Sequence, residues 1–90
     1  MVKPYSVEFR PQARNNLRRL SKANSQHVLN KINWLANNFD AVSQEALTGE
    51  FKGLFKLRIG DYRVIYSVIH EERLIVIHLV GHRRSIYERR

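Results

Sequence analysis

Residues 54–66 constrain the fold of this chain more than any other stretch. Apolar and basic residues alternate up to Gly60-Asp61 and then alternate again, which is typical of two strands joined by a tight turn. Gly60 suits the first position of a two-residue loop, because glycine adopts a positive φ without steric cost. Counting outward from this loop predicts four cross-strand pairs, Ile59 with Tyr62, Arg58 with Arg63, Leu57 with Val64 and Lys56 with Ile65.

This register gives the hairpin two chemically different faces. The basic face carries Lys56, Arg58 and Arg63, and the two arginines lie directly opposite each other. Like charges in that position destabilise a sheet, where a good cross-strand pair contributes about 0.2–1 kcal/mol. Either an anion such as a phosphate supplies the missing counter-charge, or the arginines extend into solvent. The apolar face carries Phe55, Leu57, Ile59, Tyr62, Val64 and Tyr66.

Length and composition narrow the class of protein. Ninety residues, 43% of them apolar, predict one domain over residues 1–90 that can fold alone. The chain has no cysteine and no long apolar run, so we expect a cytoplasmic protein without disulfides, signal peptide or membrane span. A net charge of +8 points to nucleic acid, an acidic protein or an anionic membrane as partner.

Two helices are expected between the first strand and the hairpin. Residues 5–9 alternate as a strand, and Pro11 is suited to the first turn of a helix. That helix should end near residues 21–22, and Asn24 or Ser25 can cap the next one, which should end at residues 37–40. The apolar stripes of the two helices are Ala13, Leu17 and Leu20, and Val28, Ile32, Leu35, Ala36 and Phe39.

The C-terminal half completes the topology. Residues 41–53 show no clear period, and residues 49–53, bracketed by two glycines, look like a loop that leads into the hairpin. Residues 62–69 are expected to form a strand and residues 70–73 a polar turn. Residues 74–80 are nearly continuously apolar, as expected of a strand that is central or covered on both faces. The order β-α-α-β-β-β predicts an α+β domain with a helical hairpin on one face of a mostly antiparallel sheet. The other face is left for a ligand or partner.

Several residues outside the hairpin have side chains that could take part in chemistry or binding. His78 and His82 would lie about 13 Å apart on a strand, too far to share a metal ion, and no metal site is expected. His78 reads as a packed strand residue, whereas His82 at a strand end could do acid–base chemistry. Trp34 lies off its helix stripe and suits packing or a partner contact. Arg83, Arg84 and Tyr87 form either a solvated tail or a segment that contacts RNA, with the tyrosine stacking on a base.

Residues 47–49, 54–66 and 81–87 together resemble the RelE/ParE toxin superfamily, and the resemblance extends over essentially the whole chain. The Gly-Asp-Tyr-Arg-Val motif that starts at Gly60 is specific to the superfamily. RelE-like members cut messenger RNA in the ribosomal A site, whereas ParE-like members poison DNA gyrase and lack the nuclease residues. A Gly-His-Arg ending followed by Tyr87 resembles the RelE branch. A gyrase-binding toxin and a plain basic RNA-binding domain remain the alternatives.

The resemblance implies a metal-independent endoribonuclease without cofactors, in which a ribose 2′-OH attacks the adjacent phosphate. Arg58 stands where the family often has its proposed general-base lysine, and arginine is a poor base because it stays protonated. Lys56 is the better base, since neighbouring arginines favour its neutral form, and His82 is the alternative. The implied catalytic set is Lys56, Arg58 and Arg63, with Arg83 for charge or leaving-group protonation and Tyr87 for stacking, while Lys52 and Arg84 would bind RNA phosphates.

The resemblance also implies partners. An acidic, RelB-like antitoxin would cover the basic face, and the targets would be the ribosome and messenger RNA. The toxin–antitoxin complex would bind operator DNA through the antitoxin, and no membrane is involved.

The position of Arg83 depends on the connection between the last two strands. With a two-residue loop at residues 71–72, Arg63 would pair with Val80 and Arg83 would point to the opposite face. With a three-residue loop at residues 71–73, or a bulge near Gly81, Arg63 pairs with Gly81 and Arg83 falls on the basic face. We predict the second arrangement, in which the small Gly81 leaves room for a ligand beside Arg63.

Overall fold

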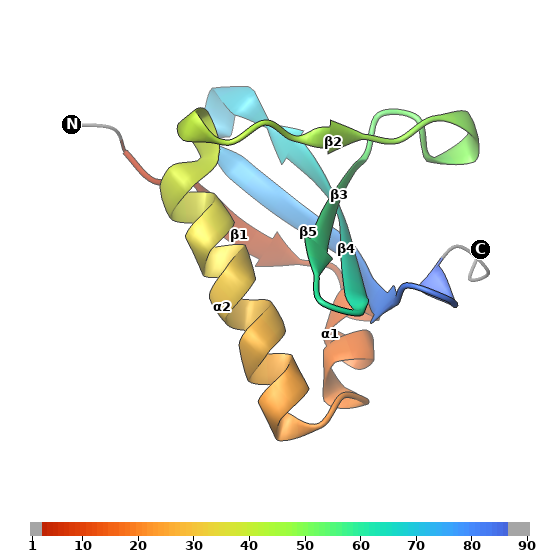
Figure 1. Cartoon of the computed structure of the whole chain (residues 1–90). Coiled ribbons are helices and arrows are strands. Elements are labelled where there is room, and N and C mark those ends of the chain that lie inside the picture. Colours follow the sequence, from red (N-terminus) through yellow and green to blue (C-terminus); the bar gives the residue numbers. More distant parts are fainter. Residues whose placement is uncertain (1–2, 87–90) are drawn as a thin grey trace.

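The computed structural model describes residues 3–86 and has the predicted α+β architecture (Figure 1). Single-turn 3-10 helices lie at Phe39–Ala41, Gly49–Phe51 and His70–Glu72. Neither α-helix of the described part is long and apolar enough to cross a membrane. The regular elements are β1 (Ser6–Phe9), α1 (Pro11–Arg18), α2 (Lys22–Asn38), β2 (Glu45–Ala46), β3 (Phe55–Ile59), β4 (Tyr62–Ile69) and β5 (Leu74–His82).

The strands form one mixed sheet in the order β1-β5-β4-β3-β2. β1 is parallel to β5, and every other neighbouring pair is antiparallel. β2 lies between α2 and the hairpin, where the predicted order β-α-α-β-β-β has no strand, so this part of the prediction is wrong. Glu45 of β2 pairs with Lys56, and Ala46 pairs with Phe55. A strand of two residues is too short to show a period in the sequence.

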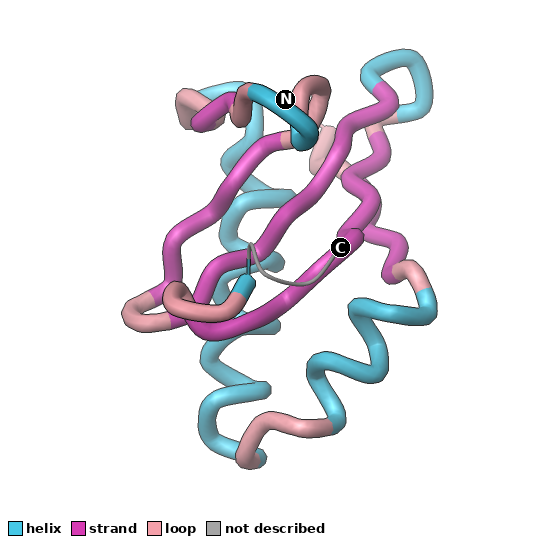
Figure 2. Tube along the Cα trace, turned by 90° about the vertical axis from the view of Figure 1, so that its right-hand side faces the viewer, coloured by secondary structure: helices cyan, strands magenta, loops and turns pink. Residues whose placement is uncertain are grey.

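Both helices lie on the same side of the sheet. When the molecule is turned by 90° from the view of Figure 1, the strands pass in front of α2 (Figure 2). The helices diverge from their shared loop (Figure 1). The main core fills the space between α2, α1 and the sheet. Its buried members are Tyr5, Ala13, Val28, Ile32, Leu35, Ala36, Phe39, Ile59, Val64, Tyr66, Ile75, Ile77 and Val80.

The boundary between the helices differs from the prediction. α1 ends at Arg18 and α2 begins at Lys22, with Ser21 as its N-cap. The Ser21 hydroxyl accepts a hydrogen bond from the Asn24 N–H at 3.1 Å. Asn24 and Ser25 therefore lie in the first turn of α2 and do not cap it, because Ser21 already satisfies the exposed N–H groups there.

The central hairpin has the predicted register. β3 and β4 pair Arg58 with Arg63 and Ile59 with Tyr62, as counted from the Gly60-Asp61 loop. Gly60 has a φ of 58°, which is the left-handed conformation that favours glycine. The alternation of apolar and basic residues therefore specified both the turn and the two faces.

Arg63 pairs with Gly81, as predicted, although the connection that brings this about is different. The loop between Ile69 and Leu74 has four residues rather than three. The register then shifts between Ile65 and Tyr66, whose partners on β5 are Leu79 and Ile77. His78 is thus the extra residue of a β-bulge. The prediction named a bulge near Gly81 as its second solution, and the observed bulge lies three residues before Gly81.

The sheet face opposite the helices, here called the open face, is partly covered. Ile65, Leu79 and Ile86 are buried there and form a second core. Leu47, Phe51 and Leu54, from the segment that precedes β3, pack against this second core. We expected this whole face to be free for a ligand, but only the surface that surrounds the second core is left uncovered.

Candidate functional site

Three cations from adjacent strands form a basic cluster on the open face, which we define as Lys56, Arg58 and Arg63. β3 contributes Lys56 and Arg58 from alternate positions, and β4 contributes Arg63 opposite Arg58. The Lys56 side chain is 15% exposed, whereas that of Arg58 is 64% exposed. Lys56 is thus held in place near the second core, while Arg58 is accessible to a ligand.

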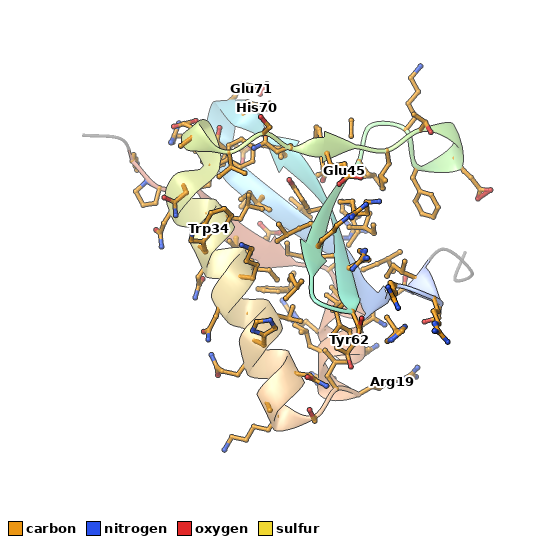
Figure 3. All side chains as sticks on the ribbon, in the orientation of Figure 1. Arg19, Trp34, Glu45, Tyr62, His70 and Glu71 are labelled. Atoms are coloured by element: carbon orange, nitrogen blue, oxygen red, sulfur yellow. The ribbon has the colours of Figure 1, made fainter. Side chains whose placement is uncertain are left out.

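Glu45 of β2 supplies a counter-charge that no sequence pattern indicated (Figure 3). Its carboxylate lies 3.0 Å from Lys56 Nζ and 3.7 Å from Arg58 Nε. Arg63 turns back along the hairpin loop, where its Nη1 donates to the carbonyls of Gly60 at 2.9 Å and Tyr62 at 2.8 Å. The protein itself therefore offsets part of the repulsion between Arg58 and Arg63.

The electrostatics of Glu45 bear on the choice of a general base. The hydrogen bond from Lys56 lowers the pKa of Glu45, and the charges of Lys56, Arg58 and Arg63 act in the same direction against desolvation. Glu45 is therefore ionised at neutral pH. Glu45 is thus a second proton acceptor beside the cluster, in contact with Lys56, and the role of Lys56 as the base stays a prediction.

The tail folds back over the sheet directly after β5. Ser85 N–H donates to the His82 carbonyl at 3.0 Å, and Ile86 returns to the second core. A Cβ atom on Gly81 would lie 2.9 Å from Cδ1 of Ile86. The space beside Gly81 is therefore filled by Ile86, and the prediction that it leaves room for a ligand is wrong.

Arg83 lies in the turn that begins this tail. Its N–H donates to the Asp61 carbonyl at 2.7 Å, and its Nε lies 3.7 Å from the Asp61 carboxylate. Both contacts fasten the start of the tail to the hairpin loop. The register that places Gly81 opposite Arg63 meets the condition for Arg83 to act beside the basic cluster, and its catalytic role stays a prediction.

His82 lies apart from the basic cluster. It pairs with Tyr62, which packs against the main core on the helix side of the sheet, and their rings meet edge to face at 5.8 Å. His82 Nδ1 accepts a hydrogen bond from the Arg84 N–H at 3.2 Å. Because side chains alternate along a strand, His82 and Arg63 face opposite sides, and His82 is not placed to act as a base in the same site.

The remaining candidate residues lie outside the basic cluster. Lys52, after the Gly49–Phe51 turn, and Arg84, after β5, are exposed, and Tyr87 lies outside the described residues. Trp34 is 41% exposed with Lys31 Nζ 3.7 Å from its ring centroid, so a core-packing role does not apply. His78 Nε2 lies 2.8 Å from Ser67 Oγ. Within residues 3–86, no three His, Cys, Asp or Glu side chains gather to hold a metal ion.

Comparison with known proteins gives these features a context. The sequence profile of the "ParE toxin of type II toxin-antitoxin system, parDE" matches residues 7–87. Toxin RelG of Mycobacterium tuberculosis (strain ATCC 25618 / H37Rv) is 34% identical over 92 residues, covering 96% of this chain and 99% of RelG.

Solved structures agree with the sequence matches. The toxin–antitoxin complex RelBE2 of M. tuberculosis contains a chain with a TM-score of 0.81 and 29% identity, over 91% of this chain and 94% of that one. The RelE–RelB complex of Pyrococcus horikoshii OT3 gives a TM-score of 0.70 and 30% identity, over 90% and 97% of the two chains.

The fold and these matches define a toxin of a type II toxin–antitoxin system. The chain belongs to the ParE toxin family, within the RelE/ParE toxin superfamily.

Proposed function

We propose that the protein is a ribosome-dependent endoribonuclease that cleaves messenger RNA in the A site and so inhibits translation. The observation that supports this most is the basic cluster of Lys56, Arg58 and Arg63, which adjoins the ionised carboxylate of Glu45 on the open face. Cleavage of RNA by its own 2′-OH requires a proton acceptor and cations around one phosphate. This face offers both kinds of group.

In the proposed step, the 2′ oxygen forms a bond to phosphorus and the bond from phosphorus to the 5′ oxygen breaks. The products are a 2′,3′-cyclic phosphate and a free 5′-OH. Glu45 accepts the 2′-OH proton, because it is the ionised acceptor next to the cluster. Lys56, whose Nζ lies 3.0 Å from the Glu45 carboxylate, neutralises charge on the phosphorane-like transition state. This assignment replaces Lys56 as the base, and no metal ion takes part.

The other cations divide between charge and orientation. Arg58 and Arg63 contact the non-bridging phosphate oxygens, for which a planar guanidinium is well suited. Arg83 adds charge or donates the proton that the departing 5′ oxygen needs. Tyr87 stacks on a base, and Lys52 and Arg84 bind neighbouring phosphates of the strand.

Cleavage on programmed ribosomes tests this proposal. Lys56→Ala and Arg63→Ala should each lower the cleavage rate by about 10²-fold or more, as expected for groups that stabilise transition-state charge. Arg18→Ala is the matched control, because Arg18 is an exposed cation on α1, away from the open face. Full cleavage by both cluster variants would contradict the proposal.

Arg83 gives a second test. Arg83→Ala should abolish toxicity in induced cells while the purified protein keeps its fold and its affinity for the antitoxin. Circular dichroism and co-purification with the antitoxin check the last two points. A fully toxic Arg83→Ala variant would show that the catalytic assignment of Arg83 is wrong.

Salt dependence tests the role of the cluster in binding. If three cations each neutralise one phosphate of a single strand, the slope of log K against log salt should be about −2 from the cluster alone. Removing one of them should reduce the slope by about 0.7. Fluorescence anisotropy with a 2′-O-methyl RNA, which cannot be cleaved, measures binding alone. Affinity that does not change with salt would exclude this account of the basic cluster.

A second function, inhibition of DNA gyrase without nuclease activity, is favoured by the ParE toxin profile that matches the chain. Induced expression separates the two. Cleaved transcripts with a fall in protein synthesis support the nuclease, whereas DNA damage with filamentation supports gyrase inhibition. A supercoiling assay with purified gyrase gives the same distinction in vitro.

The cognate antitoxin is proposed to be acidic and RelB-like, since the chain has a net charge of +8 and matches toxins solved with RelB antitoxins. Its acidic residues should meet Lys56, Arg58 or Arg63, or its chain should displace the tail that carries Tyr87. Operator DNA would be bound by the complex through the antitoxin. A structure of the complex that leaves all four residues open and in place would contradict this.

A further inference from the structure

A pocket of about 210 Å³ opens on the helix side of the sheet, where the end of α1 meets the end of β5. Figure 3 shows Arg19 and Tyr62 approaching each other there, from the end of α1 and the tip of the hairpin. The basic cluster lies on the other face of the same strands. This edge pocket, as we call it, is lined by Asn16, Arg19, Leu20, Tyr62, Val80, Gly81, His82 and Ser85.

Along this pocket, β5 has no neighbouring strand in the described part of the chain on the side away from β4. β1 accompanies β5 only as far as the pair Phe9–Ile77. Beyond it, the Val80 N–H donates to Asn16 Oδ1 at 3.0 Å and the His82 carbonyl accepts from Ser85. Both contacts show that residues 80 and 82 direct their backbone groups away from β4. In an antiparallel strand the N–H and the carbonyl of one residue point to the same side. The Val80 carbonyl and the His82 N–H therefore also point away from β4, toward the edge of β5 that has no neighbouring strand among residues 3–86.

The pocket is rich in hydrogen-bond donors. Asn16 is 7% exposed, and because its Oδ1 is engaged by Val80, its Nδ2 remains to serve the pocket. His82 Nδ1 accepts from Arg84, so the neutral ring carries its proton on Nε2. Tyr62 Oη accepts from Asn24 at 3.1 Å, which leaves its own proton to donate. Arg19 adds a guanidinium.

This donor set, with aromatic rings and a basic rim, favours a nucleotide. Tyr62 and His82 provide ring surfaces, and Arg83 and Arg84 follow immediately on β5. Aromatic side chains interleaved with cations are the usual surface for unpaired bases. Guanine and uracil have carbonyl oxygens that can accept hydrogen bonds from the donors of the pocket. Adenine has an exocyclic amine instead, which is itself a donor and cannot accept from them. The volume is below the roughly 300–1,000 Å³ of drug-sized sites, so it suits one base.

We propose that the edge pocket is a subsite for a single nucleotide with a carbonyl-bearing base, guanine or uracil. It rests on the proposed function in one respect: an RNA strand crossing the end of β5 from the basic cluster would place a flanking nucleotide there. Base selection would then come from the helix side of the sheet, while cleavage takes place on the open face.

Mononucleotides test the subsite separately from cleavage, because they contain no internal phosphodiester. The ¹⁵N-labelled full chain is titrated with GMP, UMP, AMP and inorganic phosphate, and the amide resonances are followed by NMR. GMP and UMP should shift the Asn16 side-chain amide and the backbone amides of Gly81 and Ser85. AMP should need roughly tenfold higher concentration, the factor expected for one mismatched hydrogen bond.

Arg19→Gln and Arg18→Gln form a matched pair of variants. Arg19 lines the pocket, whereas Arg18 is exposed and donates to Asn15 Oδ1. Arg19→Gln should weaken GMP binding roughly tenfold, the effect of losing one charged hydrogen bond, and Arg18→Gln should leave it unchanged. Thermal unfolding confirms that both variants are folded.

Four outcomes would overturn the proposal. Shifts confined to β3 and β4 on the open face would place the nucleotide at the basic cluster instead. Equal shifts with phosphate alone would show an anion site without base recognition. Equal weakening by Arg18→Gln would show general charge attraction. Binding of an acidic peptide to the pocket in the absence of nucleotide shifts would assign it to a protein partner. A toxin that binds GMP here but fails to cleave messenger RNA would refute the proposed nuclease and retain the subsite.

Discussion

The two faces of the sheet are stabilised in different ways. On the helix side, side chains from both helices and from β3, β4 and β5 close over one another in the main core. On the open face, the second core consists of Ile65, Leu79 and Ile86 with three partly buried neighbours, and the basic cluster adjoins it. The helix side therefore carries most of the apolar burial, while the open face combines a small core with charges that repel one another. A substitution on the first face should affect folding, and one on the second should affect activity first.

The largest effect on stability is expected from Ile77→Ala. Ile77 of β5 is fully buried in the main core, and removing such a side chain costs about 2–5 kcal/mol through lost burial and a residual cavity. Val76→Ala, one residue earlier on the open face and partly exposed, should cost about 1 kcal/mol or less. Urea unfolding of both variants measures the difference. Equal losses would contradict the comparison of the two faces.

A smaller effect on stability, with a large one on activity, is expected from Gly81→Ala. The new Cβ would meet Ile86 Cδ1 at 2.9 Å, so the tail must shift or the protein must accept an overpacking cost of about 1–3 kcal/mol. Because Arg83 and Arg84 precede Ile86 in this tail, cleavage should fall even where the fold is kept.

The double variant Gly81→Ala/Ile86→Val removes the Cδ1 atom and serves as the control for this prediction. It should recover part of both the stability and the cleavage rate, which a double-mutant cycle would report as coupling between the two positions. Additive effects would show that the 2.9 Å contact has no role.

His78 should make stability depend on pH below neutrality. Burial lowers the pKa of His78 from 6.5, and the nearby Arg10 acts in the same direction. The folded state therefore binds a proton less readily than the unfolded state. The contribution is complete above pH 6.5 and is lost as the pH falls from there through the folded pKa. Melting temperatures of the wild type should fall more steeply between pH 7.5 and 5 than those of His78→Gln.

The smallest effect on stability is expected from Glu45→Gln, because the carboxylate is exposed to solvent. Lys56 lowers the pKa of Glu45 below its ordinary value of 4.5, so the contribution is present above that pH and is lost as the pH falls through the folded pKa. Wild type and Glu45→Gln should thus converge in stability at strongly acid pH. At neutral pH, Glu45→Gln should remove cleavage, and retained cleavage would show that Glu45 is not the base.

Parts of this molecule that depend on local patterning could be predicted from the sequence. The hairpin, its register and the basic cluster follow from strict alternation around Gly60. β2 and Glu45 could not be predicted, because a strand of two residues shows no period. The position of Ile86 in the second core was equally hidden, since one apolar residue in a charged tail does not indicate what it packs against.

Other parts of the structure differ from the prediction, or could not be predicted, because the sequence allowed more than one arrangement. Ser21, Asn24 and Ser25 can all cap a helix, and only the structure shows that Ser21 does. Either a loop of odd length or a bulge would bring Arg63 opposite Gly81. The loop has four residues, so the bulge produces this pairing. The edge pocket joins α1 to β5 across more than sixty residues, so no sequence motif marks it.

The bulge at His78 marks a place where the length of this chain can change in evolution. Length changes in the turn at residues 70–73 would leave the paired strands unaltered. Deletion of His78 would also keep every residue from Leu79 onward opposite its present partner on β4, because it removes only the unpaired residue. A second deletion within β5 would find no such spare residue, and would exchange the two sides for the residues that follow it. In an alignment of functional relatives, a one-residue gap within β5 should therefore fall at the position of His78.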